Sequence, residues 1–151
     1  MKFLIQVVKN ASVSVDGSVI GSIDRGFLVF CGVCDADTEE LADKMIRKAV
    51  NLRIFEDENG KTNLSIGEIN GSMLVVSQFT LYADCRKGNR PSFIKAGDPE
   101  HANRLYEYIL SELKNTYNIR TESGSFGADM QVSLVNDGPF TVMLDSDELF
   151  G

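Results

Sequence analysis

The sequence has few of the residues that build metal centres, disulfide frameworks or nucleophile–base pairs. Its 151 residues include one histidine, three cysteines and three prolines. Three cysteines are too few, and odd in number, for a disulfide framework, and one histidine leaves a tetrahedral zinc site short of ligands. No apolar run approaches the roughly 20 residues needed to cross a bilayer, and the apolar start is too short for a secretory signal. We therefore expect a cytoplasmic protein that has no metal or cofactor and enters no membrane.

Length and net charge indicate the number of domains and the kind of partner that the protein can bind. A chain of 151 residues is expected to form one domain, residues 1–151, that buries roughly 70% of its unfolded surface. The net charge of −7 argues against a broad surface that binds phosphates. It does not exclude nucleic acid, because a local basic patch is enough to dock one end of an RNA.

The common catalytic motifs are absent as well. There is no Gly-rich phosphate loop and no G-x-S-x-G elbow, and a Ser-His-Asp arrangement would have to use His101. This histidine falls in the first turn of an expected helix, where an exposed bystander is more common than a base. An enzyme with this inventory would hold an oxyanion with backbone amides and small polar side chains, and the substrate would supply the nucleophile.

Periodicity predicts an α+β protein. Asp16-Gly17 between alternating apolar residues is typical of a hairpin turn, and Asp37 and Asp98 are expected to cap two amphipathic helices. The expected helices cover residues 38–53 and 99–115. The expected strands cover residues 2–8, 11–15, 18–23, 27–33, 73–82, 119–121, 131–135 and 140–144.

Cys31 and Cys34 match the pattern C-x-x-C. The pair ends an apolar run and precedes a loop, whereas a thioredoxin-like motif is expected to open a helix. We expect structural cysteines, and a thiol-dependent redox protein stays open as an alternative.

Two segments carry polar or stiff sequence where apolar strands end. Ser77, Gln78 and Thr80 interrupt the most apolar strand, so their side chains must find partners or line a site. Asn-Asp-Gly-Pro at residues 136–139 separates two apolar runs and predicts a small, stiff corner. Such a corner is either an ordinary loop or a place where the backbone approaches a ligand closely.

Residues 84–93 form a basic loop that contains Arg86, Lys87 and Arg90. Three cations in five residues, next to glycine and proline, make a cationic edge directly after the polar strand end. The loop either keeps the surface solvated or docks the phosphates of a nucleic acid.

Two motifs resemble the signatures of D-aminoacyl-tRNA deacylases. They are Ser77-Gln78-Phe79-Thr80 and Asn136-Asp137-Gly138-Pro139-Phe140-Thr141. Shorter stretches, among them residues 53–55, 90–93 and 126–130, also fall where that family has them, so the likeness spans nearly the whole chain. The resemblance implies a mostly antiparallel or mixed sheet curled toward a barrel, with two main helices packed on it.

The resemblance also implies an activity. Members of this family hydrolyse the ester that joins a D-amino acid, or mischarged glycine, to the 3′-terminal adenosine of tRNA. This recycles the tRNA and enforces homochirality. The ribose 2′-hydroxyl, or a water that it positions, would attack the carbonyl, in keeping with the missing general base, and Thr80 as the nucleophile is the alternative. The resemblance further implies a homodimer with active sites at the interface.

The resemblance assigns roles to single residues. Gly138 and Pro139, joined by a cis peptide in the family, would form a backbone filter that rejects L-side chains. The catalytic set at the ester would be Ser77, Gln78, Phe79 and Thr80. Substrate binding would use the filter pair together with Phe126, Met130, Asn136 and Thr141. Apart from the resemblance, the charge of the basic loop leads us to expect contacts to the tRNA from Arg86, Lys87 and Arg90.

One position departs from the family pattern. Val7 follows Gln6 where relatives usually carry an arginine that supports the Gly-Pro loop. The departure leaves open how that loop is braced in this chain. The thin catalytic inventory also leaves open a non-catalytic module that holds an RNA 3′ end or a small amino-acid-like ligand.

Overall fold

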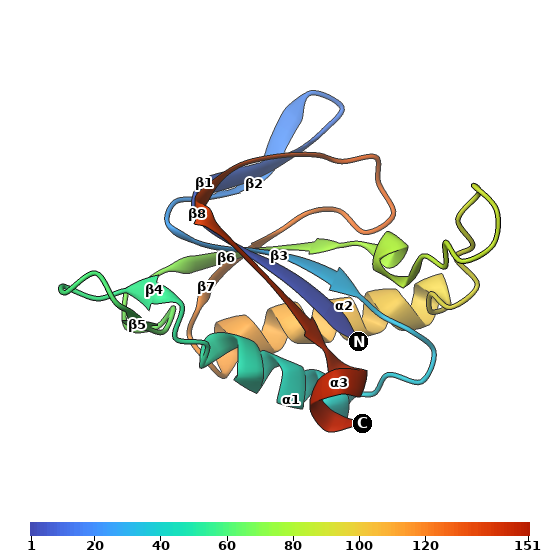
Figure 1. Cartoon of the computed structure of the whole chain (residues 1–151). Helices are drawn as coiled ribbons and strands as arrows, with labels where there is room; N and C mark the ends of the chain where they lie inside the picture. The colour runs from blue at the N-terminus through green and yellow to red at the C-terminus, as the bar shows by residue number, and fades with distance from the viewer.

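The computed structural model describes residues 1–151 as a curled sheet with two long helices on one of its faces (Figure 1). The strands are β1 (Lys2–Val15), β2 (Ser18–Ile23), β3 (Gly26–Gly32), β4 (Phe55–Glu56), β5 (Thr62–Leu64), β6 (Ser72–Ser77), β7 (Arg120–Ser123) and β8 (Gln131–Asp145). The helices are α1 (Glu39–Val50), α2 (Pro99–Asn115) and α3 (Ser146–Phe150), together with the 3-10 turn η1 (Phe79–Tyr82). The expected α+β class with a curled mixed sheet is confirmed.

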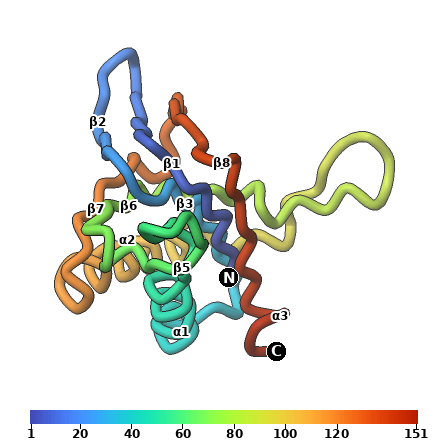
Figure 2. The backbone as a smooth tube through the Cα atoms, turned by 60° about the vertical axis from the view of Figure 1, so that its left-hand side comes forward, coloured from blue at the N-terminus to red at the C-terminus, as the bar shows by residue number.

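Strand β1 organises the sheet because it has partners along both edges. On one side it pairs with β3 through residues 2–8 and then with β2 through residues 11–15, both antiparallel. On the other side β8 runs antiparallel along β1 from residue 2 to residue 14. Beyond β3, strands β6 and β7 are added in parallel. Since β1 changes partner halfway along one edge, the sheet bends there, and the β1–β2 hairpin projects away from the helices (Figure 2).

Both faces of the sheet carry apolar side chains. A cluster of 24 buried residues fills the space between the sheet and helices α1 and α2. A second cluster of seven buried residues lies on the opposite face. Within β3, Phe27 and Val29 belong to the larger cluster and Leu28 to the smaller one. Burial on both faces explains why this strand is a continuous apolar run in the sequence.

Helix α2 has the expected bounds, with the Asp98 side chain capping its first turn. The expected cap of α1 was wrong, because Thr38 takes that place: its hydroxyl oxygen accepts a hydrogen bond from the Leu41 N–H at 3.2 Å. Asp37 is buried instead, and its carboxylate accepts hydrogen bonds from the Met1 ammonium group and the Cys34 N–H, both at 2.8 Å. A buried carboxylate needs such partners, so tertiary contacts decided its role.

The most apolar strand is shorter than the expected 73–82. It ends as β6 at Ser77, where the Gln78 N–H donates to the Cys31 carbonyl at 2.9 Å. The neighbouring strand β3 stops at Gly32, so later residues have no ladder to continue. The chain turns into η1, and Leu81 packs over Gly32, where an added Cβ would lie 3.1 Å from the Leu81 Cβ.

The residues around the Asn-Asp-Gly-Pro sequence do not separate two strands, as expected, but interrupt one. Both apolar runs belong to β8 and pair with β1. Gln6 lies opposite Thr141 and Val8 lies opposite Asn136, so residues 137–140 are extra residues opposite Val7 alone. We call residues 137–140 the Gly-Pro corner. Residues 2–8 and 11–15, expected as two strands, are likewise one strand. No helix has the length and apolar character of a membrane span.

Candidate active site

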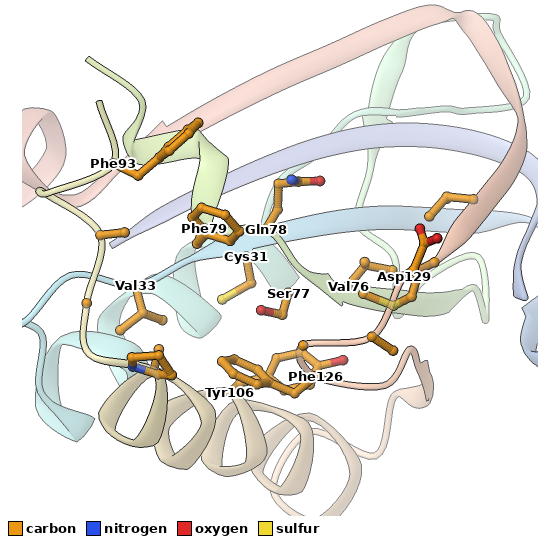
Figure 3. Close-up of a pocket in the computed structure, with 18 residues that line it drawn as sticks. Cys31, Val33, Val76, Ser77, Gln78, Phe79, Phe93, Tyr106, Phe126 and Asp129 are labelled. Atoms are coloured by element: carbon orange, nitrogen blue, oxygen red, sulfur yellow. The ribbon is translucent and has the colours of Figure 1, made fainter. Parts of the chain in front are cut away.

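A pocket of about 570 Å³ opens at the carboxyl end of β6 (Figure 3). Its walls come from the ends of β3 and β6, the start of η1, three residues between 93 and 97, the first half of α2 and residues 126–132. Twelve of the 18 lining residues are hydrophobic, which suits a ligand with a large apolar surface and a few polar groups.

Three residues of the first signature meet at this pocket. Ser77, Gln78 and Phe79 line it, whereas Thr80 is exposed and does not. Ser77 lies at the end of β6, paired with Cys31 of β3. The Gln78 side-chain amide donates a hydrogen bond to the Thr80 hydroxyl. Thr80 therefore does not line the pocket, and its link to the site is its hydrogen bond with Gln78.

The signature also places a helix start at the pocket edge. Phe79 and Thr80 are the first two residues of η1. The first amide N–H groups of a helix have no acceptor inside it, and Gln78 at the cap position provides no side-chain bond to them. Adjacent backbone donors of this kind suit an oxyanion or another polar group.

The floor of the pocket is aromatic. Tyr106 of α2 and Phe126 lie side by side, with ring centres 6.1 Å apart (Figure 3). Tyr106 is 2% exposed, and its hydroxyl donates to the Val75 carbonyl at 2.6 Å. Burial raises the pKa of Tyr106 above its usual range, so the hydroxyl stays a hydrogen-bond donor. Met130 lines the same pocket and fills space that Gly124 leaves open, since an added Cβ there would lie 2.5 Å from the Met130 sulfur.

The Gly-Pro corner lies outside this pocket. Gly138 and Pro139 are exposed, and neither lines the pocket of their own chain. The peptide bond between them is cis, as the resemblance implied. Gly138 has a φ of +123°, a backbone conformation that favours glycine.

Asn136 ties both ends of the corner to β1. Its side-chain amide donates to the Val7 carbonyl at 2.9 Å and to the Phe140 carbonyl at 3.0 Å. Its side-chain oxygen accepts from the Thr141 hydroxyl at 3.4 Å, and that hydroxyl accepts from the Gln6 amide at 3.3 Å. The Val7 side chain is buried in the core at 5% exposure, so this residue contacts Asn136 through its backbone carbonyl alone.

The cations of the basic loop differ in whether they have a partner within the chain. Arg86 folds back on Asp84, with hydrogen bonds from Nε to both carboxylate oxygens at 2.9 and 3.1 Å. The guanidinium holds the pKa of Asp84 well below its usual range. Lys87 and Arg90 are exposed and form no ion pair or hydrogen bond within the chain.

The sequence profile of the family described as D-Tyr-tRNA(Tyr) deacylase matches residues 4–145. The chain belongs to this family. A relative from Thermosipho africanus named D-aminoacyl-tRNA deacylase is 54% identical over 150 residues, which cover 99% of this chain and 100% of the relative.

Two solved structures resemble this member of the deacylase family. One, titled c-Myc DNA Unwinding Element Binding Protein, has a TM-score of 0.91 at 43% identity and covers 96% of this chain and 98% of its own. The other, titled as a probable eukaryotic D-amino acid tRNA deacylase, has a TM-score of 0.84 at 17% identity and covers 95% and 97%. The second likeness concerns the fold alone.

The cysteines of this deacylase-family chain give no support to the redox alternative. All three are free, and Cys31 is buried in the pocket wall. Burial, with a contribution from the charge of Asp37, raises the pKa of the Cys31 thiol to about 12. The reactive thiolate is therefore scarce at neutral pH. No group of three His, Cys, Asp or Glu side chains is arranged to hold a metal ion.

Sequence patterns missed part of the deacylase-family site. Tyr106 was not among the site residues expected from the sequence, yet it forms the pocket floor. Pro99 and Ala102 line the pocket as well, while His101 between them does not. The His101 Nδ1 lies 2.9 Å from an Arg104 guanidinium nitrogen, and its Nε2 is buried without a partner. An apolar helix stripe alone cannot show which of its residues faces a cavity.

Proposed function

We propose that this protein hydrolyses the ester between a D-amino acid and the 3′-terminal adenosine of tRNA. The observation that carries the proposal is the pocket in which Ser77, Gln78 and Phe79 of the family signature meet an aromatic floor. The apolar walls suit an adenosine, and the polar rim at η1 suits the ester. The proposed substrate also makes the cytoplasm the expected place of action.

The proposed mechanism takes no general base from the chain, although the carboxylate of Asp129 lines the pocket. The only histidine does not line the pocket, and Thr80 is bonded to Gln78 and exposed. In the proposed mechanism the backbone N–H groups at the start of η1 stabilise the oxyanion. A water positioned by the ribose 2′-hydroxyl attacks the carbonyl carbon, and the ester oxygen leaves as the ribose 3′-hydroxyl after taking up a proton of that water. If the 2′-hydroxyl attacks directly, the product is the 2′ ester, and a water must then hydrolyse that ester to release the amino acid.

Selectivity is proposed to come from the Gly-Pro corner of a second subunit. Gly138 and Pro139 are exposed and lie outside their own pocket, so in a homodimer they are free to enter the partner's site. Their carbonyls would face the substrate α-carbon and leave no room for an L-side chain. Glycine, which has no side chain, would pass this filter and be hydrolysed as well.

Asn136 and Thr141 are proposed to support this filter through hydrogen bonds and not through contact with the substrate. The Asn136 amide group uses its donors on Val7 and Phe140, and its oxygen accepts from Thr141. This network holds both ends of the Gly-Pro corner. It offers a brace for the corner in a chain whose residue 7 is not arginine.

The deciding experiment compares D-Tyr-tRNA, L-Tyr-tRNA and Gly-tRNA as substrates. Release from the D-ester and the glycyl ester, with the L-ester intact, is the expected result. No release from any of them would favour the non-catalytic binding module. A tRNA ending in 2′-deoxyadenosine, charged at the 3′ position, is expected to resist cleavage. A Thr80→Ala variant that binds substrate but has lost all activity would instead favour Thr80 as nucleophile.

A further inference from the structure

A projecting loop beside the pocket differs in charge from the rest of the molecule. We call residues 83–97 the finger, which extends away from the body of the fold (Figure 2). The finger carries four cations and one carboxylate, whereas the remaining residues carry 11 cations and 21 carboxylates. An anionic strand would therefore be attracted to the finger and repelled by most other surfaces.

The finger is held at its base. The N–H of Asp84 donates to the Ser92 carbonyl at 2.7 Å, and the Ser92 N–H donates back at 2.9 Å. At the C-terminal end of the finger, the Gly97 N–H donates to the Val33 carbonyl at 2.8 Å. Arg86 is occupied by Asp84 through a further ion pair at 2.5 Å. Arg86 thus belongs to the scaffold of the finger.

Two kinds of exposed side chain remain on the finger. Lys87 and Arg90 are exposed cations without an internal partner. Phe93 and Ile94 are exposed to 38% and 89%, although both are large and apolar. Phe93 packs edge-on against Phe79 at the pocket, with ring centres 5.2 Å apart (Figure 3). The exposed apolar pair is therefore continuous with the pocket rim.

We propose that the finger binds the single-stranded nucleotides that immediately precede the terminal adenosine of the substrate. Lys87 and Arg90 pair with backbone phosphates, and Phe93 and Ile94 provide the apolar surface on which a base packs. Cations combined with exposed apolar or aromatic side chains are the equipment of single-strand binding. The inference rests on the proposed function, because the pocket must hold the 3′-terminal nucleoside for the preceding ones to reach the finger.

The test compares D-Tyr-tRNA with D-tyrosyl-adenosine, an ester that lacks the preceding nucleotides. For the Lys87→Gln/Arg90→Gln double variant, the ratio of kcat/KM on tRNA to kcat/KM on the adenosine ester should fall on the order of twentyfold at 0.1 M salt. The slope of log kcat/KM for tRNA against log salt should become shallower by about 1.4, since a single strand releases roughly 0.7 counterions per phosphate. An Ile94→Ser variant should lower the same ratio by about fivefold.

Lys48→Gln, at an exposed cation on α1, is the matched control and should leave the ratio and the slope unchanged. An unchanged ratio and slope in the double variant would overturn the finger proposal while the deacylase proposal stands. An equal loss on both esters would also overturn it, because the residues would then act at the adenosine pocket or on the fold. If the wild-type protein cleaves neither ester, both proposals fall.

Discussion

The pocket and the Gly-Pro corner differ in how much of their surroundings this chain provides. The pocket has walls from β3, β6, η1, α2 and residues 126–132, and its floor is a buried tyrosine with a satisfied hydroxyl. The corner has exposed residues and contacts to its own strand and β1 through Asn136. The pocket is a complete binding cavity. The corner is a fixed backbone conformation that contacts no pocket of its own chain.

This difference separates stability from selectivity. Changes in the pocket floor remove buried contacts and should reduce the free energy of unfolding. Changes in the corner should alter catalysis and the preference for D-esters in addition to stability, whereas changes in the pocket floor should leave the preference for D-esters intact. The four predictions below use this separation, and any of them can contradict it.

The largest effect is expected for Gly138→Ala. An alanine Cβ would lie 3.1 Å from the Phe140 nitrogen, at a φ of +123° that L-residues rarely adopt. We expect deacylation of D-Tyr-tRNA to fall roughly 100-fold, and the free energy of unfolding to fall by about 1–2 kcal/mol. Gly67→Ala is the control, because an added Cβ there meets nothing within 4 Å. Full activity in Gly138→Ala would show that the Gly-Pro corner takes no part in the reaction.

Asn136→Ala is expected to have the second largest effect. Its kcat/KM on the D-ester should fall about tenfold, and the ratio of D- to L-ester cleavage should be lower. The change leaves the Val7 and Phe140 carbonyls without their donor, at a cost of about 1–2 kcal/mol in unfolding free energy. Asn115→Ala, at an exposed asparagine of α2, is the control. If Asn136→Ala loses stability but keeps its D-ester rate and selectivity, the network is only structural.

Tyr106→Phe tests the other region. Loss of the hydrogen bond to Val75 should lower the free energy of unfolding by about 1 kcal/mol, with D-ester selectivity retained. Because burial raises the pKa of folded Tyr106, its contribution to stability is complete below about pH 10 and is lost as pH rises further. Chemical denaturation of the wild type should therefore show a steeper loss of stability above pH 10 than the variant. Equal slopes would contradict this assignment.

The smallest effect is expected for Cys34→Ser, which breaks the C-x-x-C pattern without touching the pocket lining. D-ester cleavage should stay within about twofold of the wild type, as for most substitutions outside a site. The same rate should be measured with and without a thiol reductant. A thiol-dependent activity that disappears in this variant would revive the redox alternative.

Local sequence was enough for the elements whose conformation depends on neighbouring residues. Asp98 and Pro99 mark the start of α2, and its end at Asn115 also agrees with the prediction. The Asp16-Gly17 hairpin is present, with both residues at positive φ. The first signature motif indicated the family and three residues of the pocket. The helix bounds and the hairpin follow from backbone preferences and side-chain periodicity over a few residues, whereas the family follows from the resemblance of the motif.

Tertiary structure decided what depends on partners distant in the chain. Whether the two apolar runs around residues 136–139 form a hairpin or share one partner is settled by β1, some 130 positions away. The end of β6 depends on where β3 stops, and the role of Asp37 depends on the Met1 ammonium group. The sequence by itself determined the local elements and the family. The fold alone made Tyr106 a pocket floor and Asn136 a brace, because both roles depend on contacts with residues that no local pattern specifies.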